Sequence, residues 1–378
     1  MNPKGITDDD LIAALKEHGS QRKAARALGV HRRTLERRMV RLARKGYSPA
    51  HDMTHAVPDG YSVRGVSTLY RDDGSIAAQW VKSAADADRQ RELLESAFAG
   101  LADELPRVES VPYSGIKNAD LLNLYCVTDY HLGMLSWPEE TGEEWDIQIA
   151  ERLFLNWFKN AIEQSPLAER AVFAQLGDFL HYDSMQAVTP ENRNLLDADT
   201  RFQKIVRVAI RCVRAVISML LERHKHVHVI QAEGNHDPAS SIWLREWLAA
   251  IYENEPRVTV EKSPDPYYCV EHGLTSLFFH HGHKRKPGDV NEIFAAKFRE
   301  VFGRTKFSYA HMGHMHHVEA KETPLMIVEQ HRTLAARDAY ASRGGWMSGR
   351  DAKVICYSRR FGEVSRVTVS YDMVRAQS

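Results

Sequence analysis

Five apolar stretches in the C-terminal two thirds of the chain each end in Asp, Asn or His. The first three alternate with two amphipathic helical patterns, and the chain beyond them is richer in β-like segments. This order predicts an α/β fold, in which ligands bind at the carboxyl ends of the strands. We therefore expect the polar endings to lie at the carboxyl ends of strands, where they can form a ligand site. The five stretches are LLNLYCVTDYH, AVFAQLGDFLH, VHVIQAEGNHD, TSLFFHHGHK and FSYAHMGHMHH.

Each ending by itself is a weak signal, because Asn, Asp and Gly are ordinary turn residues. A single histidine at a strand end is more often a satisfied turn residue than a ligand. Five endings of this kind in one chain make that interpretation poor. Nitrogen and oxygen donors without thiolates suit divalent ions such as Mn²⁺, Fe²⁺ or Zn²⁺. The pattern thus predicts a site for two divalent metal ions.

The series D-x-H, G-D-x-x-H, G-N-H-D, H-G-H and G-H-x-H resembles that of the calcineurin-like metallophosphoesterases, over residues 119–330. This resemblance implies a four-layer α/β/β/α sandwich with a two-metal centre, for which we expect Mn²⁺, with Fe²⁺ or Zn²⁺ as alternatives. It also implies which side chains hold the ions. One ion is expected at Asp129, His131 and His316, the other at Asn235, His281 and His314, with Asp178 bridging the two.

The same resemblance implies the catalytic roles. A hydroxide bridging the metals would attack phosphorus, and His236 would help the leaving oxygen rather than bind metal. Asp237 is expected to orient His236 or tune its charge, and His181 to orient a ligand. In HHGHK, three histidines compete for one ligand position, and His281 is favoured because it directly precedes the glycine.

The first 50 residues carry 12 Lys and Arg against 5 Asp and Glu, although the whole chain has no net charge. Residues 7–46 predict three short helices, with N-caps at Thr7 and Ser20. The segment GSQRKAARALGVHRRTLERRM resembles the Fis-type helix-turn-helix, which implies DNA as a partner. A three-helix bundle used for oligomerisation and a solvated basic helix are the alternatives. The side chains expected to face DNA are Arg32, Arg33, Arg37 and Arg38.

The middle of the chain predicts a β-hairpin around Asp-Asp-Gly at 72–74 and an amphipathic helix at 86–103, followed by a linker. We therefore expect a helix-turn-helix domain at 1–50, a hairpin-plus-helix platform and linker at 51–115, and a metallophosphoesterase domain at 116–378. Two β-like runs around FGEV near the C-terminus are expected to complete the second sheet.

Other features limit the class of protein. No run approaches the roughly 20 apolar residues that a membrane span needs, and the N-terminus resembles no signal peptide. The four cysteines lie far apart, which indicates buried thiols rather than a zinc ribbon or redox motif. We expect a cytoplasmic protein, in a bacterium or a phage-infected host, with no membrane partner.

Together these patterns predict a dinuclear-metal-dependent phosphodiesterase that hydrolyses nucleic acid, with a DNA nuclease related to phage or bacterial double-strand-break repair exonucleases as the favoured form. One alternative is a nucleotidase or other small-molecule phosphoesterase with a regulatory DNA-binding head. The others are a protein phosphatase and a non-enzymatic DNA-binding regulator. A homodimer and a separate ATPase partner are further expectations.

Overall fold

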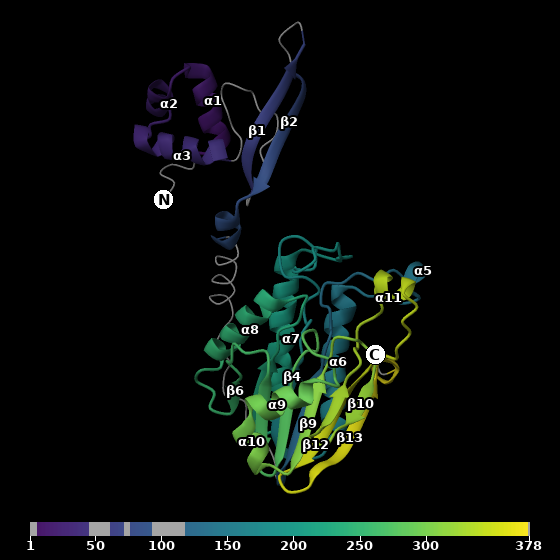
Figure 1. Ribbon diagram of the computed structural model, residues 1–378. Helices are drawn as coiled ribbons and strands as arrows, with labels where there is room; N and C mark the ends of the chain where they lie inside the picture. The colour runs from purple at the N-terminus through teal and green to yellow at the C-terminus, as the bar shows by residue number, and fades with distance from the viewer. Residues whose placement is uncertain (1–5, 45–60, 72–75, 93–117, 377–378) are drawn as a thin grey trace. The chain divides into compact units, whose positions relative to one another are not determined.

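A computed structural model describes residues 6–44, 61–71, 76–92 and 118–376 of the chain. The chain divides into two compact units, Met1–Pro106 and Arg107–Ser378 (Figure 1). Both predicted domain boundaries, the hairpin turn at 72–74, the end of the predicted helix at 86–103 and the linker lie outside the described residues. The domain limits therefore remain a prediction.

The three predicted N-terminal helices are present, and both predicted N-caps are confirmed. The hydroxyl of Thr7 accepts a hydrogen bond from the backbone N–H of Asp10 at 3.1 Å, and that of Ser20 accepts one from Lys23 at 3.3 Å. The small Ala24 side chain is fully buried, which lets the helices approach closely. The helices are α1 (Asp8–His18), α2 (Gln21–Ala27) and α3 (Arg32–Arg44), packed around a core of Leu11, Ala14, Ala24, Ala25, Leu35 and Leu42.

The predicted hairpin is also present. Strands β1 (Tyr61–Tyr70) and β2 (Ile76–Ala85) pair in antiparallel fashion, and residues 87–92 form a helical turn.

The second unit contains two β-sheets. In the six-stranded sheet, β3, β4, β5 and β6 run parallel, and β12 joins β3 in antiparallel fashion. In the five-stranded sheet, β8, β9 and β11 run parallel. In spatial order the first sheet is β13 (Gly362–Ser370), β12 (Asp351–Ser358), β3 (Asn118–Val127), β4 (Ala168–Gln175), β5 (His226–Gln231) and β6 (Val258–Val260). The second is β10 (Glu319–Glu322), β11 (Ile327–Gln330), β9 (Phe307–Met312), β8 (Thr275–Phe279) and β7 (Tyr268–His272).

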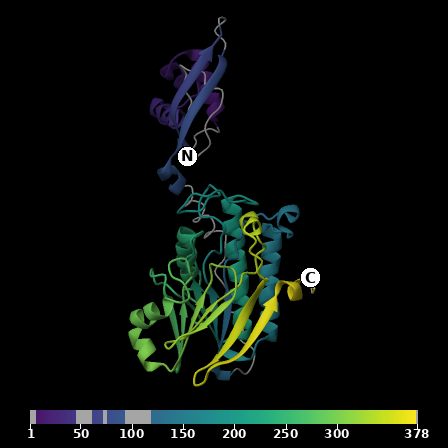
Figure 2. The same ribbon diagram turned by 45° about the vertical axis from the view of Figure 1, so that its right-hand side comes forward.

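The two sheets pack face to face through a shared apolar core. Leu124 and Val172 of the first sheet meet Leu277 and Phe279 of the second in one buried cluster. Helices cover the outer faces (Figure 2). The predicted four-layer α/β/β/α arrangement is thus confirmed. The covering helices are α6 (Ile147–Gln164), α7 (Phe202–Arg223) and α8 (Pro238–Ile251) on the first sheet, and α9 (Val290–Lys297) and α10 (Arg299–Arg304) on the second.

The expectation for the C-terminal strands is wrong. Strands β12 and β13 extend the first sheet, because β12 pairs with β3 from Lys353 opposite Cys126 to Ser358 opposite Leu121. The following helix, α12 (Tyr371–Arg375), packs on α6. The β-like character of both runs was correct, but pairing between segments about 230 residues apart carries no local sequence signal.

Among the described residues, no helix combines the length and the apolar character needed to cross a membrane.

Candidate metal centre

The ends of β3, β4, β5, β8 and β9 bring the predicted ligands together. The donor atoms of Asp129, His131 and His316 all lie within 4.8 Å of one another. A second group with the same spacing is formed by Asp129, Asp178, His281 and His314. The side-chain oxygen of Asn235 lies 3.2 Å from Nε2 of His281. The seven side chains thus form two adjoining clusters that share Asp129.

The backbone at this edge is held in an unusual conformation. Five residues of the clusters have positive φ, between 49° and 77°, which few non-glycine residues adopt. Hydrogen bonds between the loops after β3 and β4 hold this shape: the N–H of Asp129 donates to Gly177 O at 3.0 Å and that of His131 to Asp178 O at 3.0 Å. Strain of this kind gathers at functional sites. The five residues are Asp129, His131, Asp178, His314 and His316.

Two motif glycines allow backbone to approach the carboxylates. A Cβ on Gly234 would lie 2.0 Å from Oδ1 of Asp178, and one on Gly313 would lie 2.6 Å from Oδ2 of Asp129. Any larger residue in place of the glycines of G-N-H-D and G-H-x-H would therefore clash with these carboxylates. Nearby N–H groups of the same two motifs donate to these carboxylates, from His236 to Asp178 and from His314 to Asp129, each at 2.8 Å.

The site has buried negative charge that no lysine or arginine of the described chain neutralises. Oδ1 of Asp129 is buried and accepts no hydrogen bond there. Burial raises the pKa of Asp129, but the His316 and His281 imidazoles outweigh it and hold that pKa below its usual range. Burial would lower the pKa of His281, yet Asp178 and Asp129 raise it to about 9. Carboxylates, imidazoles and an amide oxygen so arranged fit a pair of divalent cations.

Of the three histidines that follow β8, only His281 joins the clusters. Its Nδ1 donates to Leu176 O at 2.7 Å, which turns Nε2 towards Asp178, 3.2 Å away. A metal-binding histidine commonly donates a hydrogen bond to a backbone carbonyl from the ring nitrogen that does not bind the metal. His280 instead stacks on Tyr267 with ring centroids 4.5 Å apart, and His283 is stacked on His280.

His236 lies beside His131, with ring centroids 4.8 Å apart, and its Nδ1 donates to His181 O at 2.8 Å. The His181 ring stacks on His236, and its Nδ1 is 3.3 Å from Nδ1 of His131. The Asp237 carboxylate is occupied elsewhere. It accepts N–H groups of Gly234 and of three residues after β4, at 2.8–3.2 Å. In the described structure, His181 rather than Asp237 therefore supports His236.

The four predicted DNA-facing arginines have different surroundings. Arg38 binds the Asp8 carboxylate and the carbonyl of Ile6, so it fastens α3 to the start of α1. Arg32 pairs with Glu36 on the same helix at 2.7 Å. Arg33 and Arg37 are exposed, and neither side chain forms an ion pair within the described part of the chain. Arg38 thus has an internal role, and Arg33 and Arg37 remain open to a partner.

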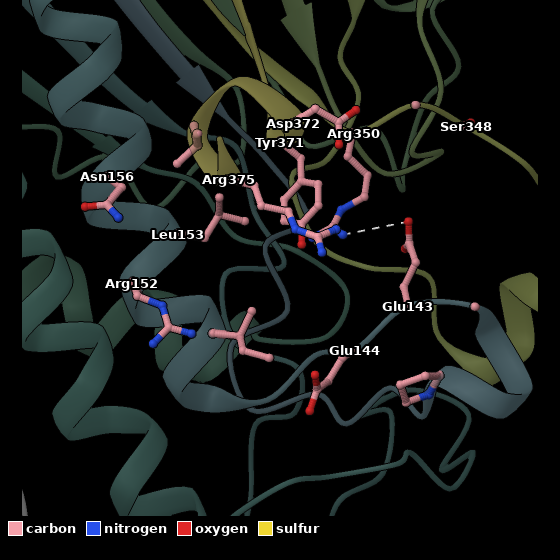
Figure 3. A pocket seen from close by; sticks show the side chains of 15 residues that line it. Glu143, Glu144, Arg152, Leu153, Asn156, Ser348, Arg350, Tyr371, Asp372 and Arg375 are labelled. Atoms are coloured by element: carbon pink, nitrogen blue, oxygen red, sulfur yellow. Dashed lines mark ion pairs between the residues drawn. The ribbon is translucent and has the colours of Figure 1, made fainter. Parts of the chain in front are cut away.

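A cavity of about 700 Å³ lies between α6, α12 and the segment before β12, and contains none of the predicted site residues (Figure 3). Its lining pairs Arg350 with Glu143 at 3.7 Å, and the Arg350 guanidinium carbon lies 3.8 Å from the centroid of the Tyr371 ring. Arg152 and Arg375 belong to the same lining as Glu144 and Asp372, so the cavity holds charges of both signs. We assign it no catalytic role.

Residues 10–42 match a family model described as bacterial regulatory protein, Fis family. No curated protein sequence matches the chain.

Several solved structures match about two thirds of the chain. A predicted phosphoesterase from Streptococcus pneumoniae is 11% identical, with a TM-score of 0.26, covering 66% of this chain and 97% of that one. Vacuolar protein sorting 29 from Cryptosporidium parvum is 13% identical, with a TM-score of 0.30, covering 66% and 98%. A putative 5′-nucleotidase from Staphylococcus aureus is 9% identical, with a TM-score of 0.31, covering 68% and 58%.

The structure adds side chains that the sequence did not single out. Thr333 donates to Asp129 O at 2.6 Å, which ties the segment after β11 to the first ligand. No sequence signal connects positions 204 residues apart. A basic run, Lys284 to Lys286, directly follows the H-G-H motif, and this one was visible in the sequence.

Proposed function

We propose that this protein is a phosphodiesterase of the calcineurin-like metallophosphoesterase type that hydrolyses nucleic acid, and specifically a DNA nuclease that uses two divalent metal ions. One observation carries the proposal: seven oxygen- and nitrogen-bearing side chains from five separate strand ends converge into two adjoining clusters. Structural polar networks rarely combine this convergence with buried carboxylates that no lysine or arginine of the described chain neutralises and with positive φ at five positions.

In this proposal Asp129, His131 and His316 hold one ion, and Asn235, His281 and His314 hold the other. Asp178 would bridge the two ions; in the structure it groups with His281 and His314, 3.2 Å from Nε2 of His281, and Asp129 is the carboxylate common to both clusters. The mixture of imidazole and oxygen donors without sulfur favours Mn²⁺, with Fe²⁺ or Zn²⁺ as alternatives. When bound, such a pair polarises phosphoryl oxygens and makes water nucleophilic at neutral pH.

The chain's own contribution beyond metal binding is a positioned imidazole. Because Nδ1 of His236 donates to His181 O, the exchangeable proton of its charged form sits on Nε2. From there His236 would donate to the leaving oxygen of the cleaved ester. Asp237 would act indirectly, because its carboxylate holds the loop that carries Asp178.

Hydrolysis of a labelled oligonucleotide by the purified full-length protein with Mn²⁺ tests this function. We expect cleavage that EDTA abolishes. His316→Ala should remove it, whereas the matched control His317→Ala should not, because His317 is exposed and belongs to neither cluster. Turnover of nucleotides or a small diester with DNA left intact would contradict the nuclease assignment and favour a small-molecule phosphoesterase.

We also propose that the helix-turn-helix recruits the protein to duplex DNA, through Arg33 and Arg37. Replacing both by alanine should weaken duplex binding and reduce the slope of log K against log salt by roughly 1 for each phosphate that is no longer neutralised. Lys159→Ala, an exposed cation on α6, is the matched control. Unchanged affinity and slope in the double variant would contradict this role.

A further inference from the structure

The segment between β11 and β12 carries aromatic side chains that are open to solvent. Tyr340 is 74% exposed and Trp346 is 55% exposed, and their ring centroids lie 5.1 Å apart. Trp137, at the N-terminal end of helix α5 (Pro138–Thr141), is also 56% exposed. Helix α11 (Ala339–Arg343) packs on α5, so both segments present large aromatic groups in one region. Exposed rings of this size in a water-facing position indicate a surface that receives a ligand.

This aromatic surface belongs to the edge that carries the proposed metal centre. Thr333 binds the carbonyl of Asp129, and the carbonyl of Arg337 accepts a hydrogen bond from Ser136 at 2.6 Å. Asp338, two residues before Tyr340, lies close enough to His316 to interact with it electrostatically. The aromatic segment is therefore tied directly to the loops that supply the ligands.

The aromatic segment is also fixed at both ends. Asp338 caps α11 by accepting the N–H of Ala341 at 2.7 Å, and Arg343 pairs with Glu140 of α5 at 2.6 Å. On the far side of Trp346, the side chain of Arg350 donates to Leu334 O at 2.8 Å and stacks on Tyr371 (Figure 3). A segment held in this way loses little backbone conformational entropy when its rings stack against a ligand.

A run of cations follows another ligand strand. Lys284, Arg285 and Lys286 all reach solvent, and within the described chain none of them forms an ion pair. Lys284 immediately follows His283, whose ring centroid is 5.3 Å from that of His281. Unpaired cations beside a phosphoester-cleaving site suit the phosphates next to the one that is cleaved.

We infer that the substrate is a single-stranded segment of nucleic acid; this inference rests on the proposed function. The bases of the strand stack on Tyr340 and Trp346. Its phosphates contact Lys284, Arg285 and Lys286. Rings that accept bases and cations that accept phosphates are together the features by which proteins bind single strands irrespective of sequence. Paired bases within a duplex do not expose the faces that such rings need.

Fluorescence anisotropy of a labelled oligo(dT) of about 12 nucleotides, measured in EDTA with the full-length protein, tests this inference without cleavage. Tyr340→Ala/Trp346→Ala should weaken binding about tenfold or more. Trp346→Phe should keep most of the affinity and Trp346→Leu should not, because only the former retains a ring. The triple variant Lys284→Ala/Arg285→Ala/Lys286→Ala should lower the salt slope by about 2.

Phe361→Ala and Arg360→Ala are the matched controls. Both residues are exposed and lie in the turn between β12 and β13. Because β12 is antiparallel to β3, this turn lies at the edge opposite the proposed metal centre. Both controls should bind like the wild type, and all variants should keep its thermal unfolding midpoint.

The inference is overturned if the wild type binds the oligonucleotide no more tightly than the aromatic double variant. It is equally overturned if the triple variant of Lys284, Arg285 and Lys286 leaves the salt slope of oligonucleotide binding unchanged. It is also overturned if the aromatic substitutions weaken duplex binding as much as single-strand binding. Hydrolysis of methyl p-nitrophenyl phosphate, a diester without a base, by the wild type with Mn²⁺ separately tests the metal-dependent phosphodiesterase chemistry of the proposed function. Turnover of this diester alongside unchanged oligonucleotide binding in the variants would reject the inference alone.

Discussion

The proposed metal centre and a second, separate cluster of histidines and a carboxylate lie in the same unit and differ in the cations around them. In the proposed metal centre, the only basic partners of Asp129 and Asp178 within the described structure are histidines. The second cluster is formed by His311, Glu329 and His331, whose donor atoms also lie within 4.8 Å of one another. Proximity of donors alone therefore does not distinguish the two.

The second cluster already contains its positive charge. Glu329 is buried and accepts hydrogen bonds from Lys353 at 2.5 Å and from Arg366 at 3.0 Å. Nδ1 of His311 is 2.9 Å from Nε2 of His331, and Nε2 of His311 is 3.0 Å from the hydroxyl of Tyr357, so both nitrogens of His311 already have protein partners. A divalent cation at this position would be repelled by the positive charges of Lys353 and Arg366 or would have to displace them. The comparison teaches that a metal site needs carboxylates without protein cations, and we regard the second cluster as structural.

The largest expected difference concerns hydrolysis. Asp178→Asn should lower Mn²⁺-dependent diester hydrolysis by roughly 10²–10³-fold or more, because it removes the carboxylate proposed to bridge the two ions. The bound Mn²⁺ per chain, measured by elemental analysis after gel filtration, should also fall. Glu329→Gln should leave the metal content unchanged. Loss of metal in Glu329→Gln, with none in Asp178→Asn, would reverse the assignment of the two clusters.

The next largest effect concerns folding stability. Glu329→Gln should reduce the free energy of unfolding by about 3 kcal/mol, because it leaves the Lys353 ammonium without its buried partner, whereas Arg366 keeps its pair with Glu363. Urea denaturation followed by circular dichroism measures this. Replacing Lys353 by Met in the same variant should recover part of the loss. A Glu329→Gln variant as stable as the wild type would show that the network contributes nothing.

The pH dependence of stability should report the same network. Burial lowers the pKa of His331 to about 4 from an ordinary value of 6.5, so the folded chain holds it neutral while the unfolded chain takes up a proton. Stability should therefore fall by about 3 kcal/mol for this group as pH drops from roughly 6.5 to 4. Urea titrations at about pH 7 and pH 4.5 measure the loss. His331→Leu should reduce it, and an equally steep loss in that variant would contradict the role.

The smallest effect is the stabilisation of the wild type by metal. Mn²⁺ at about ten times its dissociation constant should raise the free energy of unfolding by about 1.4 kcal/mol per site, because only the folded chain assembles the ligands. Differential scanning fluorimetry with and without Mn²⁺ measures the shift. The shift should vanish in Asp178→Asn and persist in Glu329→Gln. Equal shifts in both variants would indicate binding elsewhere.

Much of this architecture could be predicted because it depends on local sequence patterns. The amphipathic period over Ile147–Gln164 and the caps at Thr7 and Ser20 match the structure. The convergence of Asp129 and Asp178 followed from two adjacent parallel strands, β3 and β4, whose ends meet, whereas His314 comes from β9 of the other sheet. The helices and caps needed only periodicity and capping preferences, and the carboxyl ends of strands are where α/β folds bind ligands, but the metal role of each side chain came from the family resemblance.

The remaining features depend on contacts between distant segments. Nothing near Asp237 indicates that its carboxylate would bind the loop after β4 rather than its neighbour His236. The pairing of β12 with β3 and the engagement of Arg38 with Asp8 are likewise non-local. The histidines and acid of the second cluster share the residue types of a metal site, and only their partners, Lys353 and Arg366, distinguish them.

The bonds of Asp237 have a consequence for protein engineering. This one carboxylate gathers the main-chain amides of two turns that arise from separate strands, so a change of length in either turn would disturb both. The G-N-H-D peptide would accordingly lose its geometry if it were transplanted by itself into another scaffold. The smallest portable piece is a pair of adjacent parallel strands with both of their succeeding turns.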